Sequence, residues 1–278
     1  MEIVNDITSL RDILRSKKSI TFVPTMGNLH GGHLSLIQKA RQQQTDCIVV
    51  SIFVNQLQFL PNEDFEQYPR TLEEDCKRLK NYGVNIVFAP NQKTLYPEPQ
   101  ETLLTPPPIA NELEGKFRPG YFCGVATVVL KLFNIIQPQI AIFGSKDYQQ
   151  LHIVKKMVKQ LNLPINILAG ETIRLQNGLA LSSRNQYLNE MQLKEATRLY
   201  QTLNEIKQFV EKGNKDFISL QENAINILTK FGWRVDYIEL RQKKNLSNAT
   251  FDDTNLVVLG AAWLNKTRLI DNLEIHCK

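Results

Sequence analysis

The sequence is poor in the residue types that build metal sites and disulfide frameworks. Among its 278 residues there are only four cysteines and four histidines. The cysteines form no CxxC pair, which excludes a zinc ribbon and a dithiol redox centre. They are Cys47, Cys76, Cys123 and Cys277. Thiols this far apart are typical of buried or incidental cysteines in a reducing compartment.

Long apolar runs are also missing. A membrane-spanning helix needs about 20 apolar residues, whereas the longest runs here are the strand-length Cys47–Val54 and Val125–Ile136, which Lys131 interrupts. The segment Met1–Arg11 is charged and lacks the apolar core of a signal peptide. We therefore expect a cytoplasmic protein with no membrane partner.

Neither sign of charge dominates. The chain has 33 basic and 28 acidic residues, which gives a net charge of +5. This small surplus favours an anionic small-molecule substrate and is too diffuse to indicate a nucleic-acid partner. Hydrophobic residues make up 42% of the chain, enough for the core of one large or two moderate domains.

Apolar runs of strand length alternate with segments of helix length over about the first 170 residues. Strands that are apolar along their whole length indicate a doubly wound parallel sheet with helices on both faces. Thr71 is expected to cap its helix, with Glu74 completing a capping box. The predicted strands are Ser19–Thr25, Asp46–Val54, Val84–Ala89, Gln139–Phe143 and Ile165–Ala169. The predicted helices are Gly32–Arg41, Thr71–Tyr82, Gly120–Ile136 and Asp147–Asn162, and residues 90–119 form a proline-rich loop.

The pattern changes near residue 172. The segment Gln176–Gly178 reads Gln-Asn-Gly and predicts a tight turn. Two polar helices and two alternating strands follow, which predicts a smaller α+β domain. The helices are expected at Glu190–Lys212 and Lys215–Phe231, and the strands at Arg234–Arg241 and Asn255–Trp263.

Two of the four histidines fall in one tetrapeptide, His30-Gly31-Gly32-His33, where the first predicted strand passes into the first predicted helix. Open parallel sheets bind ligands at the carboxyl ends of their strands, and a helix N-terminus presents unpaired N–H groups. The two glycines let a ligand approach the backbone, and imidazoles three residues apart share one face of the first turn. The segment therefore predicts a nucleotide phosphate site centred on His30 and His33.

Two other interpretations of the histidine pair remain open. A His-x-x-His pair can bind a metal ion, although the sequence offers no obvious third ligand, and a histidine in a turn is often a plain surface or capping residue. The P-loop pattern GxxxxGK[ST] is absent, as is GxGxxG after a strand. ATP, if it binds, must be held by these histidines and by distant basic residues.

Four further segments place polar side chains at predicted strand ends, turns or loops. Cationic groups there can bind phosphate or carboxylate, and amides can bind hydroxyl or carboxylate groups without adding charge. Each segment taken alone is also explained as an ordinary polar loop, cap or turn. The side chains are Lys146 and Gln150, Asn55 and Gln58, Ser182, Ser183 and Arg184, and Arg118.

Taken in order, these segments resemble the pantoate–β-alanine ligase family, whose members are also called pantothenate synthetases. The resemblance covers nearly the whole chain. The His-x-Gly-His form is shared with class I aminoacyl-tRNA synthetases and related nucleotidyltransferases, and Leu181–Asn185 resembles the second motif of those enzymes. The segments that carry the resemblance are Pro24–His33, Ser51–Phe59, Tyr68–Thr71, Leu113–Gly120, Phe143–Gln150 and Leu179–Asn185.

The resemblance implies a Rossmann-like N-terminal domain, residues 1–172, that binds nucleotide and pantoate. It also implies a smaller C-terminal α+β lid domain, residues 173–278, with the active site between the two domains. A homodimer is expected, and the apolar strand Cys47–Phe53 with the loop after it is a candidate interface region.

The implied reaction has two steps and belongs to coenzyme A precursor biosynthesis. Pantoate attacks the α-phosphate of ATP, which gives pantoyl adenylate and pyrophosphate. The amine of β-alanine then attacks the acyl carbon, which gives pantothenate and AMP. Mg²⁺ is expected on the phosphates, and its protein ligands are not implied by the motifs.

The family pattern also assigns site residues. Gln58 corresponds to a contact of pantoate and β-alanine, Gln150 to a contact of pantoate, and Asn55 and Arg118 to further substrate positions. The implied catalytic residues are His33, His30, Lys146 and Arg184. The implied ATP contacts are Met26, Gly27, Asn28, Leu29, His30, Gly31, Gly32, His33, Gly144, Ser145, Lys146, Asp147, Ile173, Leu181, Ser182, Ser183 and Arg184.

By the resemblance, His33 takes the position that the family assigns to a proton donor. The chemistry of the first step changes this expectation. A carboxylate is already ionised at neutral pH, so pantoate needs no general base. The step needs alignment and stabilisation of phosphate charge, which donors such as His30 and His33 provide. We therefore expect them to stabilise the departing pyrophosphate rather than to act as acid–base catalysts.

Two positions depart from the family pattern. Ser145 stands where members usually carry glutamate or glutamine, and Tyr121 stands where they usually carry histidine. Tyrosine keeps a hydrogen-bonding group but carries no positive charge near pH 7.

Two alternatives to the ligase remain. One is another His-x-Gly-His nucleotidyltransferase that acts on a phosphorylated acceptor, and the other is a nucleotide-binding protein without catalysis. The presence of His30, His33, Lys146 and Arg184 together argues against the second, because binding alone does not require all four.

Overall fold

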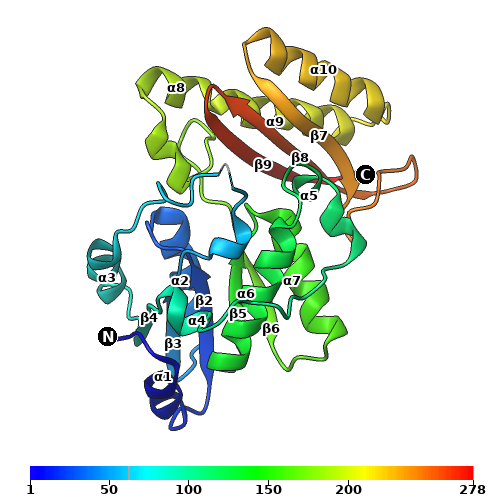
Figure 1. The fold of residues 1–278 in the computed structure, drawn as a ribbon. Coiled ribbons are helices and arrows are strands. Elements are labelled where there is room, and N and C mark those ends of the chain that lie inside the picture. Colours follow the sequence, from blue (N-terminus) through cyan, green and yellow to red (C-terminus); the bar gives the residue numbers. More distant parts are fainter. Residues whose placement is uncertain (62, 278) are drawn as a thin grey trace. The chain divides into compact units, whose positions relative to one another are not determined.

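The computed structural model describes residues 1–61 and 63–277, and these fold into two compact units (Figure 1). The first unit comprises Met1–Ser145 and Gln150–Glu171. The second comprises Lys146–Gln149 and the chain from Thr172 onward. Each unit has its own sheet and its own hydrophobic core.

A six-stranded sheet forms the centre of the first unit, in the order β1-β4-β3-β2-β5-β6, and all neighbouring strands are parallel. From β2 the chain proceeds to β3 and β4 on one side, and from β5 to β6 on the other. The topological switch point therefore lies between β2 and β5, where sheets of this type bind ligands at the carboxyl ends of the strands. The strands are β1 Glu2–Val4, β2 Ile20–Thr25, β3 Cys47–Ile52, β4 Ile86–Phe88, β5 Ile140–Gly144 and β6 Asn166–Gly170.

Helices cover both faces of this sheet. Along β3, Cys47 and Val49 pack in a core with α1, α6 and α7, whereas Ile48 and Val50 pack in a second core with α2 and α3. Continuous apolar strands therefore serve two cores, and the predicted doubly wound α/β fold is confirmed. The long helices are α1 Ile7–Leu14, α2 Gly31–Gln42, α3 Leu72–Lys80, α6 Tyr121–Ile136 and α7 Tyr148–Gln160, and the short α4 Gln92–Leu95 and α5 Glu114–Phe117 lie in the proline-rich loop.

The second unit is an antiparallel sheet, in the order β7-β8-β9, with helices packed on it. Leu203 of α9 and Leu228 of α10 share a core with Ile238 and Val258 of the sheet. The smaller α+β unit predicted at the C-terminus is confirmed. Its elements are α8 Glu190–Glu195, α9 Thr197–Glu211, α10 Phe217–Lys230, β7 Arg234–Gln242, β8 Asn255–Leu264 and β9 Thr267–His276.

The capping box predicted for α3 is wrong. Thr71 occupies the N-cap position but makes no capping hydrogen bond. Its hydroxyl instead donates to the Asp75 carboxylate (3.1 Å), which a buried loop also uses as an acceptor. Thr71 thus bonds to a side chain one turn along the same helix, and that side chain makes the tertiary contact with the loop.

The sequence missed β1, α1 and β9. β1 has only three residues. β9 turns Asp271 and Asn272 toward the interior (5% and 7% exposed), and these polar residues break the apolar alternation that identifies a strand. The helix predicted at Glu190–Lys212 is interrupted at Ala196, between α8 and α9.

The strand proposed for a dimer interface is buried inside the chain. Cys47, Val49 and Val50 have no exposed surface, and β3 is flanked by β2 and β4. The prediction is wrong for this strand, because its side chains are already packed in the two cores of the first unit.

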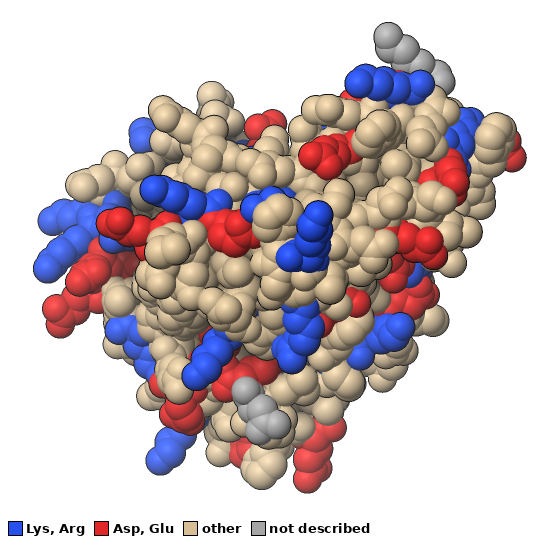
Figure 2. All heavy atoms as spheres, turned by 90° about the horizontal axis from the view of Figure 1, so that it is seen from above, with Lys and Arg blue, Asp and Glu red and all other residues tan. Residues whose placement is uncertain are grey.

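The described residues include no helix with the length and apolar character needed to cross a bilayer. On the face shown in Figure 2, Lys and Arg side chains are interspersed with Asp and Glu side chains. The positive surplus is therefore not gathered into one basic surface on that face.

Candidate active site

The predicted nucleotide motif follows β2 at the switch point of the sheet. Residues 26–30 form the turn, and α2 begins at Gly31 with His30 as its N-cap. Gly27 and Asn28 have positive φ angles of 84° and 50°, which a glycine and an asparagine tolerate better than other residues. The turn leads the chain out of a buried strand and directly into a helix.

The two histidines are fixed by backbone hydrogen bonds. The Gly32 N–H donates to His30 Nδ1 (3.1 Å), and the His30 N–H donates to His33 Nδ1 (3.3 Å). The ring centroids are 4.2 Å apart. A neutral imidazole that accepts at Nδ1 carries its proton on Nε2. Each neutral histidine is therefore a donor at Nε2.

Asn55 and Gln58 follow β3 and form an amide network that is almost closed to solvent. Asn55 is 1% exposed, and its Nδ2 donates to Gln58 Oε1 (3.1 Å) and to the Gly124 carbonyl (3.2 Å). Tyr96 donates to Asn55 Oδ1 (2.8 Å). Burial raises the pKa of Tyr96, so its phenol stays protonated as a donor. Asn55 thus has its amide engaged within the protein and orients Gln58.

The side chain of Gln58 is left with a donor that faces a weak acceptor. Its Nε2 lies 3.0 Å from the sulfur of Met26, and thioether sulfur accepts only weak hydrogen bonds. The network depends on a glycine in α6, because a Cβ at Gly124 would lie 2.0 Å from the Leu57 carbonyl oxygen. The close approach of α6 to the segment that carries Gln58 therefore requires glycine.

Arg118 is held by an internal carboxylate. Its Nε and Nη2 donate to the two oxygens of Glu63, each at 2.6 Å, and Nη2 also donates to the Gln58 carbonyl (3.1 Å). Burial opposes the charge, but the hydrogen bonds and charge of Glu63 raise the pKa of Arg118 above its usual value. The guanidinium is charged and bound to Glu63.

Tyr121 connects Arg118 with Gln150. The Arg118 guanidinium lies over the Tyr121 ring, 3.7 Å from its centroid. The Tyr121 hydroxyl donates to Gln150 Oε1 (3.3 Å). The tyrosine at the position where the family usually has histidine therefore supplies both an aromatic face and a hydrogen-bond donor.

These contacts bring the four predicted substrate residues into one network within the first unit. Met26 contacts Gln58, Gln58 contacts Asn55 and Arg118, and Arg118 reaches Gln150 through Tyr121. Met26 also begins the histidine loop. The network therefore joins the predicted pantoate contacts to the first predicted ATP contact.

In the second unit, β9 holds the segment that contains Lys146. The Asn272 Nδ2 donates to the Lys146 carbonyl (2.9 Å), and Tyr148 donates to Glu274 Oε1 (2.9 Å). Ser145, the last residue of its segment in the first unit, donates its N–H to the Gly170 carbonyl (2.8 Å). Ser145, which replaces the glutamate or glutamine usual in the family, thus lies where this backbone hydrogen bond links the end of β5 to β6.

The other predicted residues of the second unit lie around the Gln176–Gly178 turn, which the structure confirms with φ of +91° at Gly178. Arg174 donates to both Asp271 carboxylate oxygens (2.7 and 2.8 Å) and so fixes the turn to β9. Leu181 donates its N–H to the Ile173 carbonyl (2.9 Å).

A 3₁₀ turn, Ser183–Tyr187, follows, and Ser182 caps it by accepting from the Arg184 N–H (3.2 Å). The Ser182 side chain therefore helps to order the start of this turn.

The sequence did not identify several residues that shape the site, namely Glu63, Asp75, Tyr96, Gly124, Asp271 and Asn272. Each acts through a partner far away in the chain, such as Asn272 on Lys146, 126 positions apart. The only local signal was the Glu-Glu-Asp run at the start of α3, which looks like ordinary acidic residues in a first helical turn.

The structure offers no support for a metal centre built from side chains. Within residues 1–61 and 63–277, no group of three His, Cys, Asp or Glu residues could hold a metal ion. The Nδ1 atoms of His30 and His33 accept from backbone N–H groups, which leaves only the Nε2 atoms as possible ligands.

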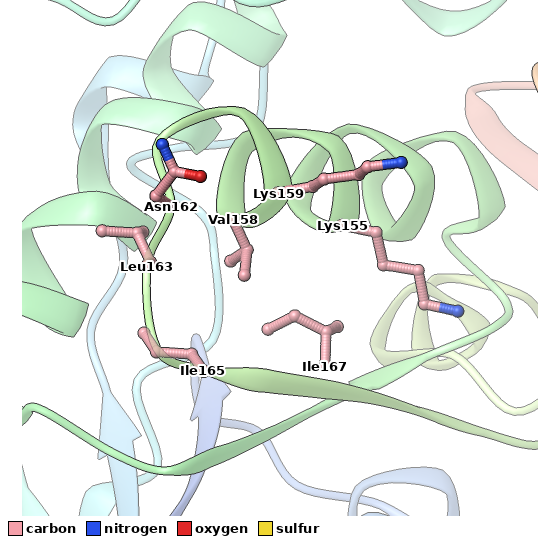
Figure 3. Close-up of a pocket in the computed structure, with 7 residues that line it drawn as sticks. All are labelled: Lys155, Val158, Lys159, Asn162, Leu163, Ile165 and Ile167. Carbon is pink, nitrogen blue, oxygen red and sulfur yellow. The ribbon is translucent and has the colours of Figure 1, made fainter.

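An open groove of about 450 Å³ lies apart from all of these residues. Figure 3 shows it between the C-terminal half of α7 and the start of β6, at the opposite end of that strand from the carboxyl edge. It contains none of the predicted site residues. Its lining is Lys155, Val158, Lys159, Asn162, Leu163, Ile165 and Ile167.

Comparison with known proteins gives concordant results. A family model described as pantoate-beta-alanine ligase matches residues 2–274. A pantothenate synthetase from Nitrosospira multiformis is 60% identical over 100% of this chain and 99% of its own length. A pantothenate synthetase structure from Thermus thermophilus matches with a TM-score of 0.94 and 40% identity, covering 99% of this chain and 100% of that one.

A pantoate-beta-alanine ligase from Francisella tularensis, solved in complex with beta-gamma ATP and beta-alanine, matches with a TM-score of 0.83 and 36% identity. The match covers 98% of this chain and 97% of that one.

Proposed function

Since the chain belongs to the pantoate–β-alanine ligase family, we infer that it condenses pantoate with β-alanine in a reaction driven by ATP. The products are pantothenate, AMP and pyrophosphate, and the intermediate is pantoyl adenylate. The observation that carries this inference is the family match over residues 2–274, which spans both compact units.

Pantoate is assigned to the amides of Gln58 and Gln150. The oxygen of each amide accepts within the protein, Gln58 from Asn55 and Gln150 from Tyr121. Each amide therefore has its NH₂ group to donate to hydroxyl and carboxylate oxygens, which are the polar groups of pantoate. Asn55 is assigned a supporting role, because its own amide is engaged with protein groups.

Arg118 can bind a substrate carboxylate through its Nε and Nη2 pair only if Glu63 gives up the two hydrogen bonds that it now makes. In the present geometry Arg118 instead holds the Gln58 carbonyl and stacks on Tyr121. We assign it to shaping the pantoate site, with substrate contact conditional on release of Glu63.

ATP is assigned to the histidine loop and to the strand end at Gly144, with further contacts from Lys146, Asp147, Ile173 and the segment 181–184. His30 and His33 present Nε2 donors at a helix N-terminus, a suitable environment for phosphate. Leu29 is assigned a role in the shape of the loop, because its side chain is 1% exposed and its N–H and carbonyl are bonded to α3.

The first step then requires no proton transfer. The ionised pantoate carboxylate attacks the α-phosphorus, and pyrophosphate leaves as its charge is stabilised by His30, His33, Lys146 and Arg184. The second step requires the neutral amine of β-alanine, which attacks the acyl carbon and displaces AMP. His33 is therefore assigned as a donor to the phosphates.

Mg²⁺ is proposed as the companion of ATP. The described residues contain no acidic cluster that could hold it. We expect the phosphates and water to supply most of its ligands, as is common for Mg²⁺ on nucleotides.

Three further features stay predictions: a homodimer, a cytoplasmic location and the lid role of residues 173–278. All four cysteines are free thiols, which supports a reducing compartment. Sedimentation equilibrium of the purified protein tests the dimer directly.

ATP–pyrophosphate exchange tests the function. Exchange is expected with pantoate alone, and addition of β-alanine should produce AMP and pantothenate. Absence of pantoate-dependent exchange would contradict the ligase. Exchange only with a phosphorylated acceptor would indicate the other nucleotidyltransferase, and ATP binding without exchange would indicate a non-catalytic protein.

A further inference from the structure

The turn at residues 26–30, here called the histidine loop, is hydrogen-bonded to side chains on one face of α3. Asp75 is 1% exposed, and its carboxylate accepts from the Asn28 N–H at Oδ2 (2.8 Å) and from the Leu29 N–H at Oδ1 (2.7 Å). Thr71 donates its hydroxyl to the same Oδ2 (3.1 Å), and Arg78 donates to the Leu29 carbonyl. We call Thr71, Asp75 and Arg78 the α3 clamp.

The spacing of the clamp explains why one helix can make all of these contacts. Residues 71, 75 and 78 are separated by four and three positions, so they lie along one face of α3. Asp75, the central residue, accepts the loop N–H groups, and Arg78 donates to the Leu29 carbonyl. Two consecutive N–H groups of the loop are thereby matched by one carboxylate.

The loop needs such a partner because of its backbone conformation. Gly27 and Asn28 are both left-handed. This conformation costs most non-glycine residues about 1–2 kcal/mol and asparagine less. A Cβ at Gly27 would lie 3.2 Å from Asp75 Oδ2 and 3.0 Å from Ile52 Cγ2. Hydrogen bonds to a charged acceptor are stronger than those to a neutral one, so the carboxylate is well suited to stabilise this turn.

We propose that Asp75 is a positioning residue for ATP: through the Asn28 and Leu29 N–H groups, it sets the geometry from which His30 and His33 donate. The proposal rests on the assignment of ATP to this loop. His30 directly follows Leu29 and caps α2, so a change in the direction of the loop moves both imidazoles. The pantoate amides are oriented by Asn55 and Tyr121, and their link to the loop is the weak contact of Gln58 Nε2 with the Met26 sulfur. A change at Asp75 should therefore affect them less than it affects the histidines.

The test is the isosteric variant Asp75→Asn. Its amide keeps one acceptor and turns an NH₂ group toward a loop N–H or toward Thr71. Loss of one charge-assisted bond should raise the KM for ATP about tenfold or more, and the Kd of a non-hydrolysable ATP analogue should rise in parallel. The KM for pantoate should rise by clearly less than the KM for ATP, because the variant removes a contact of the histidine loop and none of the hydrogen bonds that orient Gln58 and Gln150.

Two further variants complete the experiment. Thr71→Val removes only the hydroxyl donation and should shift the KM for ATP in the same direction, by about two- to threefold. Asp6→Asn makes the same chemical change at a carboxylate that caps α1 by accepting from the Ser9 N–H (2.8 Å). This control should keep the wild-type KM values. If Asp75→Asn fails to fold, Thr71→Val decides the question.

The outcomes separate this proposal from the proposed function. A wild-type protein without pantoate-dependent exchange refutes the function itself. An active wild-type protein with a folded Asp75→Asn variant whose KM for ATP is unchanged overturns the clamp. Equal increases in the KM for ATP, pantoate and β-alanine also overturn it, because they indicate a general structural role.

Discussion

Replacing Tyr121 with phenylalanine isolates a single hydrogen bond of the pantoate site. The variant keeps the ring that stacks under the Arg118 guanidinium, 3.7 Å from its centroid, and removes only the hydroxyl that donates to Gln150 Oε1. Without that donor the Gln150 amide loses the contact that orients it. Its NH₂ group is then less often directed at pantoate.

The magnitude follows from the geometry of the bond. A neutral hydrogen bond contributes about 0.5–1.5 kcal/mol net. The 3.3 Å separation of the two oxygens exceeds the usual range for O–H···O bonds, so the lower half of that interval applies. We therefore expect the KM for pantoate to rise about two- to fivefold, with little change in the KM for ATP.

The assay is initial-rate pyrophosphate release at saturating ATP and β-alanine, with pantoate varied. Urea unfolding should show a loss of no more than about 1 kcal/mol for Tyr121→Phe, the value of the hydrogen bond, because the cation–π contact is retained. Tyr121→Ala is the contrasting variant, since it also removes the ring and should lower the free energy of unfolding by about 1 kcal/mol or more. A pantoate KM that does not change in a folded Tyr121→Phe protein would refute the assignment of Gln150 to pantoate through this tyrosine.

Three other predictions concern the phosphates, the packing of the amide network and acid stability. His33→Ala should lower kcat by about 10²–10³ with the fold retained, and a nearly wild-type rate would remove His33 from the catalytic set. Gly124→Ala should lower the free energy of unfolding by about 1–3 kcal/mol, because its Cβ would lie 2.0 Å from a backbone oxygen; an unchanged urea midpoint would contradict the close packing. The hydrogen bond from Arg198, followed by that from Trp233, lowers the pKa of Glu195. The ionised Glu195 carboxylate therefore contributes its full stabilisation above its unfolded pKa of about 4.3. This stabilisation is lost as the pH falls through the lower folded pKa. The difference in urea midpoint between wild type and Glu195→Gln should therefore shrink from pH 6 to pH 3.

The fold was predictable because its signals are local. Apolar runs of strand length, such as Cys47–Val54, reveal a covered parallel sheet without any knowledge of which strands are neighbours. The elements that escaped detection are those in which the local signal is weak. β1 has three residues, and β9 carries the buried Asp271 and Asn272.

The candidate site was predictable only in part, for the same reason. His30 and His33 are three residues apart, and Gln58 lies shortly after a predicted strand. Both the residue types and their positions at strand ends could therefore be predicted from the sequence. Arg118 is the instructive contrast. Its sequence suggested a contact with a substrate carboxylate, and the structure places it on Glu63 instead. A guanidinium binds either carboxylate equally well, so residue type could not distinguish them.

The sequence by itself determined the class of fold, the histidine turn at the end of the first long strand, and the residue types able to bind a nucleotide and a hydroxy acid. Only the tertiary structure decided how these residues are held. Asp75 meets the Leu29 N–H from 46 positions away, and Glu63 meets Arg118 from 55 positions away. Such contacts leave no periodic or local pattern, because folding brings the partners together through the packing of helices on a sheet. The chemistry of the histidine turn could be inferred from one short segment. Its geometry depends on α3, and no local pattern predicts that this helix packs against the turn.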